Sequence, residues 1–313
     1  MALLKLQAPT KDYLWGGSRL VDEFGKKAAG EVTAESWELS CFPGSESIIE
    51  NGEYAGRTIT EYIKDNNGSL GYNCDKFKDF PVLIKLIDAK NDLSLQVHPS
   101  DEFAREHENQ YGKTEMWYIL DAEEDAFLYY GFNKEVTKDE FARRIEDETL
   151  TEVLNACPVQ KGDIFFIESG TLHAIGKGIL LAEIQQNSNV TYRVYDYGRR
   201  DKDGNLRELH VEKALEVTHL SPIQKVKKPE PHIGVCKYFT VDKVNLTGDT
   251  TKKIMGTVGE ESFLHILFLD GKGVIRNGNE EMPFSKGDSF FLPAKSGNYE
   301  ILGFCEALTT YEK

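Results

Sequence analysis

The chain has 313 residues, 40% of them hydrophobic and 28% charged, which is enough for about two soluble domains with buried cores. Its formal net charge of −15 argues against general binding to nucleic acids or anionic membranes, so an anionic ligand would need a local basic pocket. The five cysteines form no Cys-x-x-Cys pair, and the first residues lack the apolar core of a signal peptide. We therefore expect reduced thiols, no membrane-spanning segment and a cytoplasmic protein.

Short apolar runs separated by Gly, Asn and Asp predict a mostly β fold. Runs of this length and frequency are typical of a barrel or sandwich rather than of a parallel α/β sheet. The predicted strands are residues 81–88, 93–97, 116–120, 126–132, 163–167, 178–184 and 191–197.

Two helical segments interrupt this pattern. The first is a helical insertion over about residues 134–156, where Thr137 and Glu140 form a possible capping box before an apolar helix face. The second is residues 210–220, followed by the basic, proline-containing stretch 221–232. We place the domain boundary there, which predicts an N-terminal catalytic domain over 1–220 and a second domain over 221–313.

Four side chains at strand edges could bind one metal ion. Gln96 and His98 are two residues apart in a predicted strand, so they point to the same face. Glu115 begins the next apolar run, and His173 follows a glycine-containing turn after another strand. Each of these residues alone is more often a satisfied structural polar group than a ligand. Together, two imidazoles, a carboxylate and an amide suit a cation such as zinc and leave room for water or substrate.

The sequence also contains an internal repeat. The Lys-Gly-Asp segment 161–173 recurs as 286–298, and the strand 116–121 resembles 265–270. Two matching blocks in the same order favour duplication of a barrel. The helical insertion lies between the blocks of the first copy and has no counterpart in the second.

The second copy lacks the metal ligands. In the register of the repeat, Leu264 replaces Glu115 and Asn298 replaces His173. We therefore predict one metal ion per chain, in the N-terminal barrel, and a degenerate C-terminal barrel without metal ligands.

Several longer segments resemble one enzyme family. The runs YLWGG, AESWELS, EMWYIL and GTLHAIGKGILLAEIQQNSNVTYRVYDYGR resemble the zinc-dependent, class I mannose-6-phosphate isomerases in their short bacterial form. The resemblance covers roughly residues 5–313 and is strongest over 80–120 and 160–200. It implies a bicupin, which is two cupin barrels, with a small helical insertion. It also implies reversible isomerisation of D-mannose 6-phosphate and D-fructose 6-phosphate.

The resemblance assigns roles to further residues. Arg193 corresponds to the active-site arginine, which would pair with the substrate phosphate or with a developing oxyanion. Ser94, Lys113 and Glu183 also match pocket positions. Proton transfer would use Glu183 or Lys113, and the sequence does not choose between them. The metal ligands it implies are the four found by spacing, namely Gln96, His98, Glu115 and His173.

Two other functions explain part of this pattern. A sugar-binding cupin without catalysis explains the ligands but not Lys113, Glu183 and Arg193 together. A metal-dependent oxygenase is less consistent with a glutamine ligand and with redox-inactive zinc. Roles for Arg199 and Arg200 remain open. We expect a small phosphorylated sugar as partner, and a monomer or weak homo-oligomer.

Overall fold

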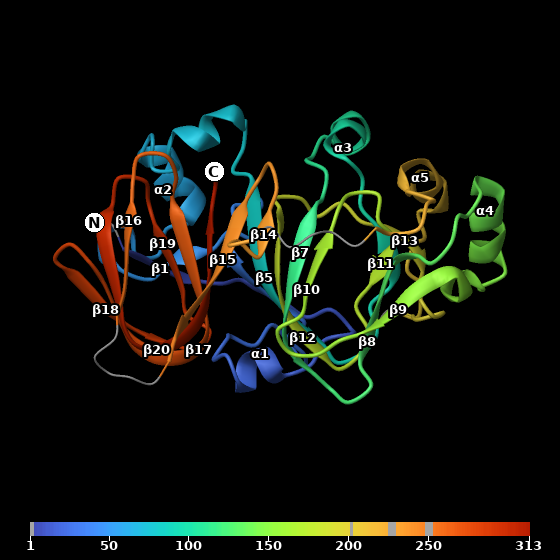
Figure 1. The fold of residues 1–313 in the computed structure, drawn as a ribbon, viewed down its shortest axis with the longest axis horizontal. Helices are drawn as coiled ribbons and strands as arrows, with labels where there is room; N and C mark the ends of the chain where they lie inside the picture. Colours follow the sequence, from blue (N-terminus) through green and yellow to red (C-terminus); the bar gives the residue numbers. More distant parts are fainter. Residues whose placement is uncertain (1–2, 201–202, 225–229, 248–252) are drawn as a thin grey trace.

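The computed structural model describes residues 3–200, 203–224, 230–247 and 253–313. Part of the predicted boundary, residues 225–229, lies outside these ranges. Within them the fold is mostly β, as predicted, and two β barrels lie side by side (Figure 1). None of the helices in the described ranges is long and apolar enough to cross a membrane.

The first barrel consists of two antiparallel sheets. Every predicted strand overlaps an observed one. The six-stranded sheet has the order β10 (Ile164–Ile167), β7 (Glu115–Ala122), β12 (Ile179–Gln186), β5 (Val82–Ala89), β3 (Glu35–Leu39) and β2 (Thr10–Lys11). The five-stranded sheet has the order β13 (Tyr192–Tyr195), β6 (Leu95–Val97), β11 (His173–Ala174), β8 (Phe127–Phe132) and β9 (Leu154–Pro158).

The second barrel is a nine-stranded sheet. Its main order is β14 (Gly234–Val235), β15 (Thr240–Leu246), β20 (Gly297–Tyr311), β17 (Leu264–Asn277), β19 (Ser289–Leu292), β1 (Leu4–Gln7) and β4 (Ile48–Ile49). Strand β16 (Lys253–Val258) pairs with β20, and β18 (Glu280–Ser285) pairs with β17. Strands β1 and β4 therefore join the second barrel, although the predicted boundary puts residues 1–220 in the first domain. The division of the rest of the chain into two domains stays a prediction.

Helices surround the barrels rather than forming a layer (Figure 1). They are α1 (Arg19–Asp22), α2 (Ile59–Asp65), α3 (Asp101–Glu108), α4 (Lys138–Glu146) and α5 (Val211–Val217), with 3-10 turns η1 (Gly52–Tyr54), η2 (Tyr72–Lys76) and η3 (Leu150–Val153). Helix α5 confirms the helix predicted over 210–220.

The helical insertion is shorter than predicted. Helix α4 begins after Thr137, whose hydroxyl accepts a hydrogen bond from the Glu140 backbone N–H at 3.1 Å. The Glu140 carboxylate accepts from Lys134 and Arg144, at 2.9 and 2.8 Å, rather than completing a capping box. The predicted helical span runs to residue 156, but strand β9 already begins at Leu154, because its backbone pairs with β8.

Strand register supports the duplication. In the first barrel Ile167 pairs with Glu115, and in the second Leu292 pairs with Leu264, as the sequence repeat requires. Both β7–β12 and β17–β20 contain a bulge at the equivalent position. A one-residue slip would turn every side chain to the opposite face, so matched register means matched inward positions.

The two Lys-Gly-Asp turns are also alike. The Gly162 N–H donates to the carbonyl of Ile119 at 2.8 Å, and the Gly287 N–H donates to that of Phe268 at 2.7 Å. Both glycines have φ near +90°, at 92° and 89°, which side chains rarely adopt. The glycine in each copy is therefore required by the turn.

The central strands of the six-stranded sheet are buried on both faces. Every residue of β5 and of β12 is buried. One face lines the interior of the first barrel, and Leu86, Ala182 and Tyr118 on the other face belong to a core cluster that also contains Phe291 and Leu308 of the second barrel. Each Å² of apolar surface buried between the barrels stabilises their contact by about 25 cal/mol. Burial on both faces also explains why these strands lack an alternating polar pattern.

The second barrel has a buried histidine, His265, where the first has a methionine. It occupies the position of Met116, is fully buried, and its Nε2 lies 2.7 Å from the Ser289 hydroxyl oxygen. Burial, with the Lys26 charge as a smaller cause, lowers its pKa to about 3. In the unfolded chain this histidine binds a proton below about pH 6.5, whereas in the folded chain it stays neutral down to about pH 3. The free energy of unfolding therefore falls as the pH decreases from about 6.5 to about 3.

We expect His265→Met to reduce this acid sensitivity. Between pH 6.5 and 4.5 the free energy of unfolding of the wild type should fall by about 1 kcal/mol per pH unit more than that of the variant. Urea unfolding at several pH values measures the difference. Equal slopes for both proteins would contradict it.

Candidate functional site

The four predicted metal ligands come together inside the first barrel. His173 on β11 is the direct cross-strand partner of Gln96 on β6, and Gln96 Nε2 lies 3.5 Å from His173 Nε2. One ligand atom each from His98, Glu115 and His173 lie within 4.8 Å of one another, and all three residues are buried. Three strands and the segment after β6 thus converge on one point.

Both imidazoles are oriented by the backbone. His98 Nδ1 lies 2.9 Å from the carbonyl oxygen of Val190, and His173 Nδ1 lies 2.9 Å from that of Thr171. A carbonyl can only accept, so each Nδ1 carries the proton and each Nε2 presents a lone pair to the site. Such hydrogen bonds are the usual support for histidine ligands of metals.

The Glu115 carboxylate is the second reason why a cation fits. The side chain is fully buried, and its Oε1 has no hydrogen-bond donor within the described part of the chain, while His173 Nε2 lies 3.5 Å away. Burial, increased by the Glu183 charge, raises the pKa of Glu115 to about 8. Burial also lowers the pKa of His98 well below its usual value and that of His173 to about 4. Neutral imidazoles beside an orphaned carboxylate oxygen are a donor set that a divalent cation satisfies.

Lys113 already places a positive charge at this donor set. Its Nζ lies 3.2 Å from His98 Nε2 and bonds Glu115 Oε2. It also lies 3.7 Å from Glu183 Oε1. A metal ion and the ammonium group would compete for the same two ligand atoms. Lys113 is therefore adjacent to the candidate ligand cluster.

Sequence reasoning missed a second buried lysine, Lys85. Its Nζ lies 3.2 Å from Glu183 Oε1 and 3.5 Å from Glu35 Oε2. Trp37 and Trp117 donate their indole N–H groups to Glu35 and Glu183, at 2.7 and 2.9 Å. A lysine within the apolar run PVLIKLID was the available signal, because a buried ammonium needs an anionic partner.

Glu183 is held ionised by this arrangement. Burial alone would raise its pKa, but Lys113 and Lys85 outweigh that effect and lower it to about 2. The unpaired alternative, a charged carboxylate in an apolar barrel, would be costly. Glu183 is therefore an anion at neutral pH.

These groups open into a cavity of about 260 Å³. The cavity is lined by Ser94, Gln96, Lys113, Glu183 and Arg193. Arg193 Nε donates to the Ser94 hydroxyl oxygen at 3.2 Å, and the Ser94 hydroxyl lies 3.3 Å from Gln96 Oε1. The structure thus brings together every residue that the sequence singled out for catalysis or substrate binding.

Arg199 and Arg200 differ in their surroundings. Arg199 pairs with Asp196 and donates to the carbonyl of Asp92. Arg200 is exposed and donates to the carbonyl of Gly204 at 2.7 Å. Neither belongs to the lining of the 260 Å³ cavity, whereas Arg207, which the sequence did not single out, does.

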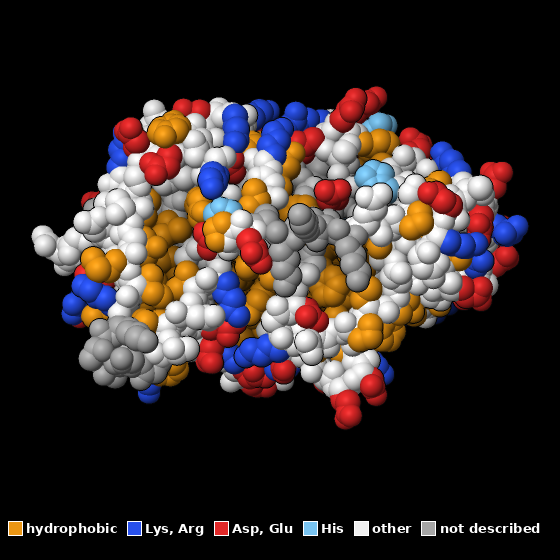
Figure 2. Space-filling view, viewed as in Figure 1, with side chains coloured by type: hydrophobic (Ala, Val, Ile, Leu, Met, Phe, Trp, Pro, Cys, Tyr) orange, Lys and Arg blue, Asp and Glu red, His pale blue; other side chains and the backbone are white. Residues whose placement is uncertain are grey.

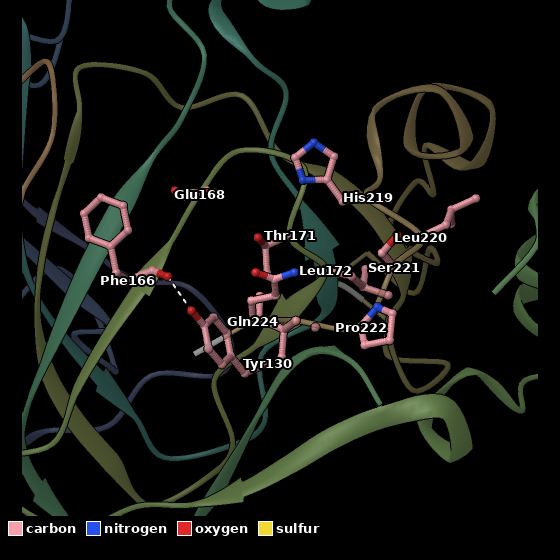
Figure 3. Close-up of a pocket in the computed structure, with 12 residues that line it drawn as sticks. Tyr130, Phe166, Glu168, Thr171, Leu172, His219, Leu220, Ser221, Pro222 and Gln224 are labelled. Carbon is pink, nitrogen blue, oxygen red and sulfur yellow. Dashed lines mark hydrogen bonds between the residues drawn. The ribbon is translucent and has the colours of Figure 1, made fainter. Parts of the chain in front are cut away.

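A larger cavity of about 610 Å³ lies elsewhere on the first barrel (Figure 3). Its charged or titratable side chains, Glu168, His219 and Tyr130, form no ligand cluster, and the Tyr130 hydroxyl is bonded to the carbonyl of Phe166 at 2.6 Å. On the face shown in Figure 2, side chains of both charge signs are interspersed among the described residues. The candidate catalytic residues Lys113, Glu183 and Arg193 line the smaller cavity, so we take that cavity as the candidate active site.

Comparison with known proteins identifies the family. A family model described as "Phosphomannose isomerase type I, catalytic domain" matches residues 3–128, and one described as "Mannose-6-phosphate isomerase, cupin domain" matches residues 231–312. Mannose-6-phosphate isomerase ManA of Bacillus subtilis is 39% identical over 317 residues, covering 96% of both chains. The chain belongs to the type I phosphomannose isomerase family.

Other members agree along the whole length of the chain. Mannose-6-phosphate isomerase of Streptococcus mutans is 35% identical and covers 98% of both chains. The crystal structure of mannose 6-phosphate isomerase from Bacillus subtilis matches with a TM-score of 0.90 at 34% identity, covering 99% of both chains. A protein from Archaeoglobus fulgidus, at 23% identity and a TM-score of 0.81, shares the fold.

Lys85 gives a stability prediction for the site. Lys85→Met removes the cation between two buried carboxylates, so we expect the free energy of unfolding to fall by about 3 to 5 kcal/mol. Lys177→Met, at an exposed position, should change it by less than about 0.5 kcal/mol. Urea unfolding of the three proteins measures both effects. Equal stability of the two variants would show that the buried ion pairs are not required.

Proposed function

We propose that this member of the family is a zinc-dependent mannose-6-phosphate isomerase that interconverts D-mannose 6-phosphate and D-fructose 6-phosphate. The observation that carries the proposal is the buried cluster of His98, Glu115 and His173 beside a cavity lined by Lys113, Glu183 and Arg193. The substrate is then a small phosphorylated sugar. A cytoplasmic location and a monomeric or weakly associated state remain predictions.

The metal ligands in this proposal are Gln96, His98, Glu115 and His173. Zinc is the cation that best suits two imidazole nitrogens, a carboxylate and an amide oxygen. The Gln96 amide would present its oxygen after turning over, since its Nε2 faces His173 and its Oε1 faces Ser94. When bound, it supplies a Lewis acid that polarises the oxygens of the sugar. The chain itself keeps the imidazoles neutral and oriented and excludes bulk water from the ligands.

The isomerisation requires a proton to leave one carbon and return to its neighbour. Glu183 is an anion at neutral pH, and its Oε1 lies 3.7 Å from Lys113 Nζ. We propose that the two groups share the transfer: the Glu183 carboxylate accepts the proton from one carbon, the Lys113 ammonium returns a proton to the neighbouring carbon, and the proton on Glu183 then passes to Lys113. Arg193 can stabilise the negative charge that develops on oxygen, because its guanidinium lies in the same cavity.

Metal dependence tests the proposal. We expect one zinc ion per chain, loss of isomerase activity on chelation, and recovery when zinc is added. His98→Ala and His173→Ala should each abolish zinc binding, whereas His107→Ala, at an exposed position, should keep it. Metal analysis and a coupled assay for fructose 6-phosphate measure these outcomes. Full activity of metal-free protein would refute the role of the metal, and tight sugar binding without turnover would indicate a binding protein.

Arg193 tests the catalytic assignment. Arg193→Ala should preserve zinc content and lower kcat by about 100-fold or more, because the developing charge loses its partner. Arg193→Lys should recover little, since an ammonium cannot reproduce a planar, two-pronged contact. Zinc content and kcat of both variants give the answer. Near-wild-type turnover of Arg193→Ala would overturn the assignment.

A further inference from the structure

A bidentate ion pair stands at one end of the catalytic cavity. Asp196 accepts hydrogen bonds from Arg207 Nε and Nη2, each at 2.6 Å, one on each carboxylate oxygen. Asp196 is buried, at 6% exposure, and it also pairs with Arg199. Two parallel bonds fix the plane of the Arg207 guanidinium as well as its position.

Arg207 differs from its neighbours in what it faces. It lines the 260 Å³ cavity together with Arg193 and Ser94. Arg199 uses its donors on Asp196 and on the carbonyl of Asp92. The bidentate contact with Asp196 therefore holds Arg207 at the cavity that contains the catalytic groups.

The arginines around Asp196 carry more positive charge than the acidic groups that they contact can balance. Asp196 offers one negative charge to two arginines, and the Arg193 side chain donates to neutral acceptors, the Ser94 hydroxyl and the carbonyl of Glu208, at 3.2 and 2.9 Å. Burial first, and then the Arg207 charge, lowers the pKa of Arg193. Two half-buried guanidinium groups facing one cavity are stabilised by an anionic ligand.

The proposed metal site adjoins the same cavity. Arg193 reaches Gln96 through the Ser94 hydroxyl, and Lys113 lines the cavity beside Glu115. The volume of about 260 Å³ lies just below the roughly 300–1,000 Å³ of typical small-molecule pockets, which suits a compact ligand. A sugar phosphate could thus place its reacting carbons beside the proposed metal ligands and its phosphate at the arginines.

We propose that Arg207, positioned by Asp196, is a second phosphate-binding residue beside Arg193 and determines the preference for a phosphorylated sugar. The inference rests on the proposed function, because it takes the substrate to be a hexose phosphate. Guanidinium groups bind phosphate through two parallel hydrogen bonds, and Arg207 is already aligned in one plane by Asp196. Asp196 acts through Arg207 and is a positioning residue.

Binding to zinc-loaded protein tests the inference independently of turnover. In Arg207→Gln we expect the Kd for mannose 6-phosphate to rise about 100-fold, and that for unphosphorylated mannose to change less than about 3-fold. Arg207→Lys should lie between the variant and the wild type, because it keeps the charge but loses the fixed plane. Arg200→Gln, which removes an exposed arginine outside the cavity, is the matched control. Calorimetric titration and zinc analysis measure these values.

Asp196→Asn tests the positioning role. Its effect on mannose 6-phosphate binding should be smaller than that of Arg207→Gln, and the double variant should be no weaker than Arg207→Gln alone, because both changes act through one contact. Additive losses would show that Asp196 does not act through Arg207. The phosphate assignment would be overturned if Arg207→Gln weakened the binding of mannose 6-phosphate and of mannose to a similar extent. It would also be overturned if Arg207→Gln weakened binding no more than Arg200→Gln does. Absence of isomerase activity in the wild type would instead refute the proposed function while the binding comparison still decides the role of Arg207.

Discussion

Ionised groups buried in the first barrel must lie against groups of opposite charge, and this constraint organises the site. Glu35, Lys85, Glu183 and Lys113 form a row in which acidic and basic side chains alternate, with neighbouring charged atoms at most 3.7 Å apart. Glu115, whose pKa is raised to about 8 by burial, bonds to Lys113 at the end of this row. Loss of Lys85 would leave Glu35 without its ion-pair partner in a medium of low dielectric constant. Structural support and chemical reactivity therefore depend on the same contacts.

The second barrel contributes to this environment without supplying ligands. It covers the outer face of the six-stranded sheet, where Tyr118 donates to Glu306 at 2.6 Å across the interface. The central strands of the sheet, β5 and β12, are consequently buried along their whole length. Low exposure is what raises the pKa of Glu115 and lowers that of His173.

The two barrels preserve a common framework with different interiors. Turn geometry, strand order and the β-bulge are shared, whereas Leu264 stands in the position of Glu115 and Thr309 in that of Glu183. Backbone pairing depends on main-chain groups that all residues possess, so a barrel can lose its reactive side chains and keep its register. In the second barrel the buried His265 imidazole is neutral and is bonded to the Ser289 hydroxyl rather than directed at a cluster of metal ligands.

The strands, the repeat and the placement of Gln96 and His98 on one face could be predicted from the sequence. Side-chain alternation and turn glycines act over a few residues, so a local pattern is enough to show them. Family resemblance added the residues of the cavity, whose roles remain predictions. Only the tertiary structure showed that Lys85 lies between two carboxylates, that Arg207 returns to Asp196, and that β1 joins the second barrel. These contacts join residues far apart in the chain, and their geometry depends on the register between strands, which no local pattern specifies.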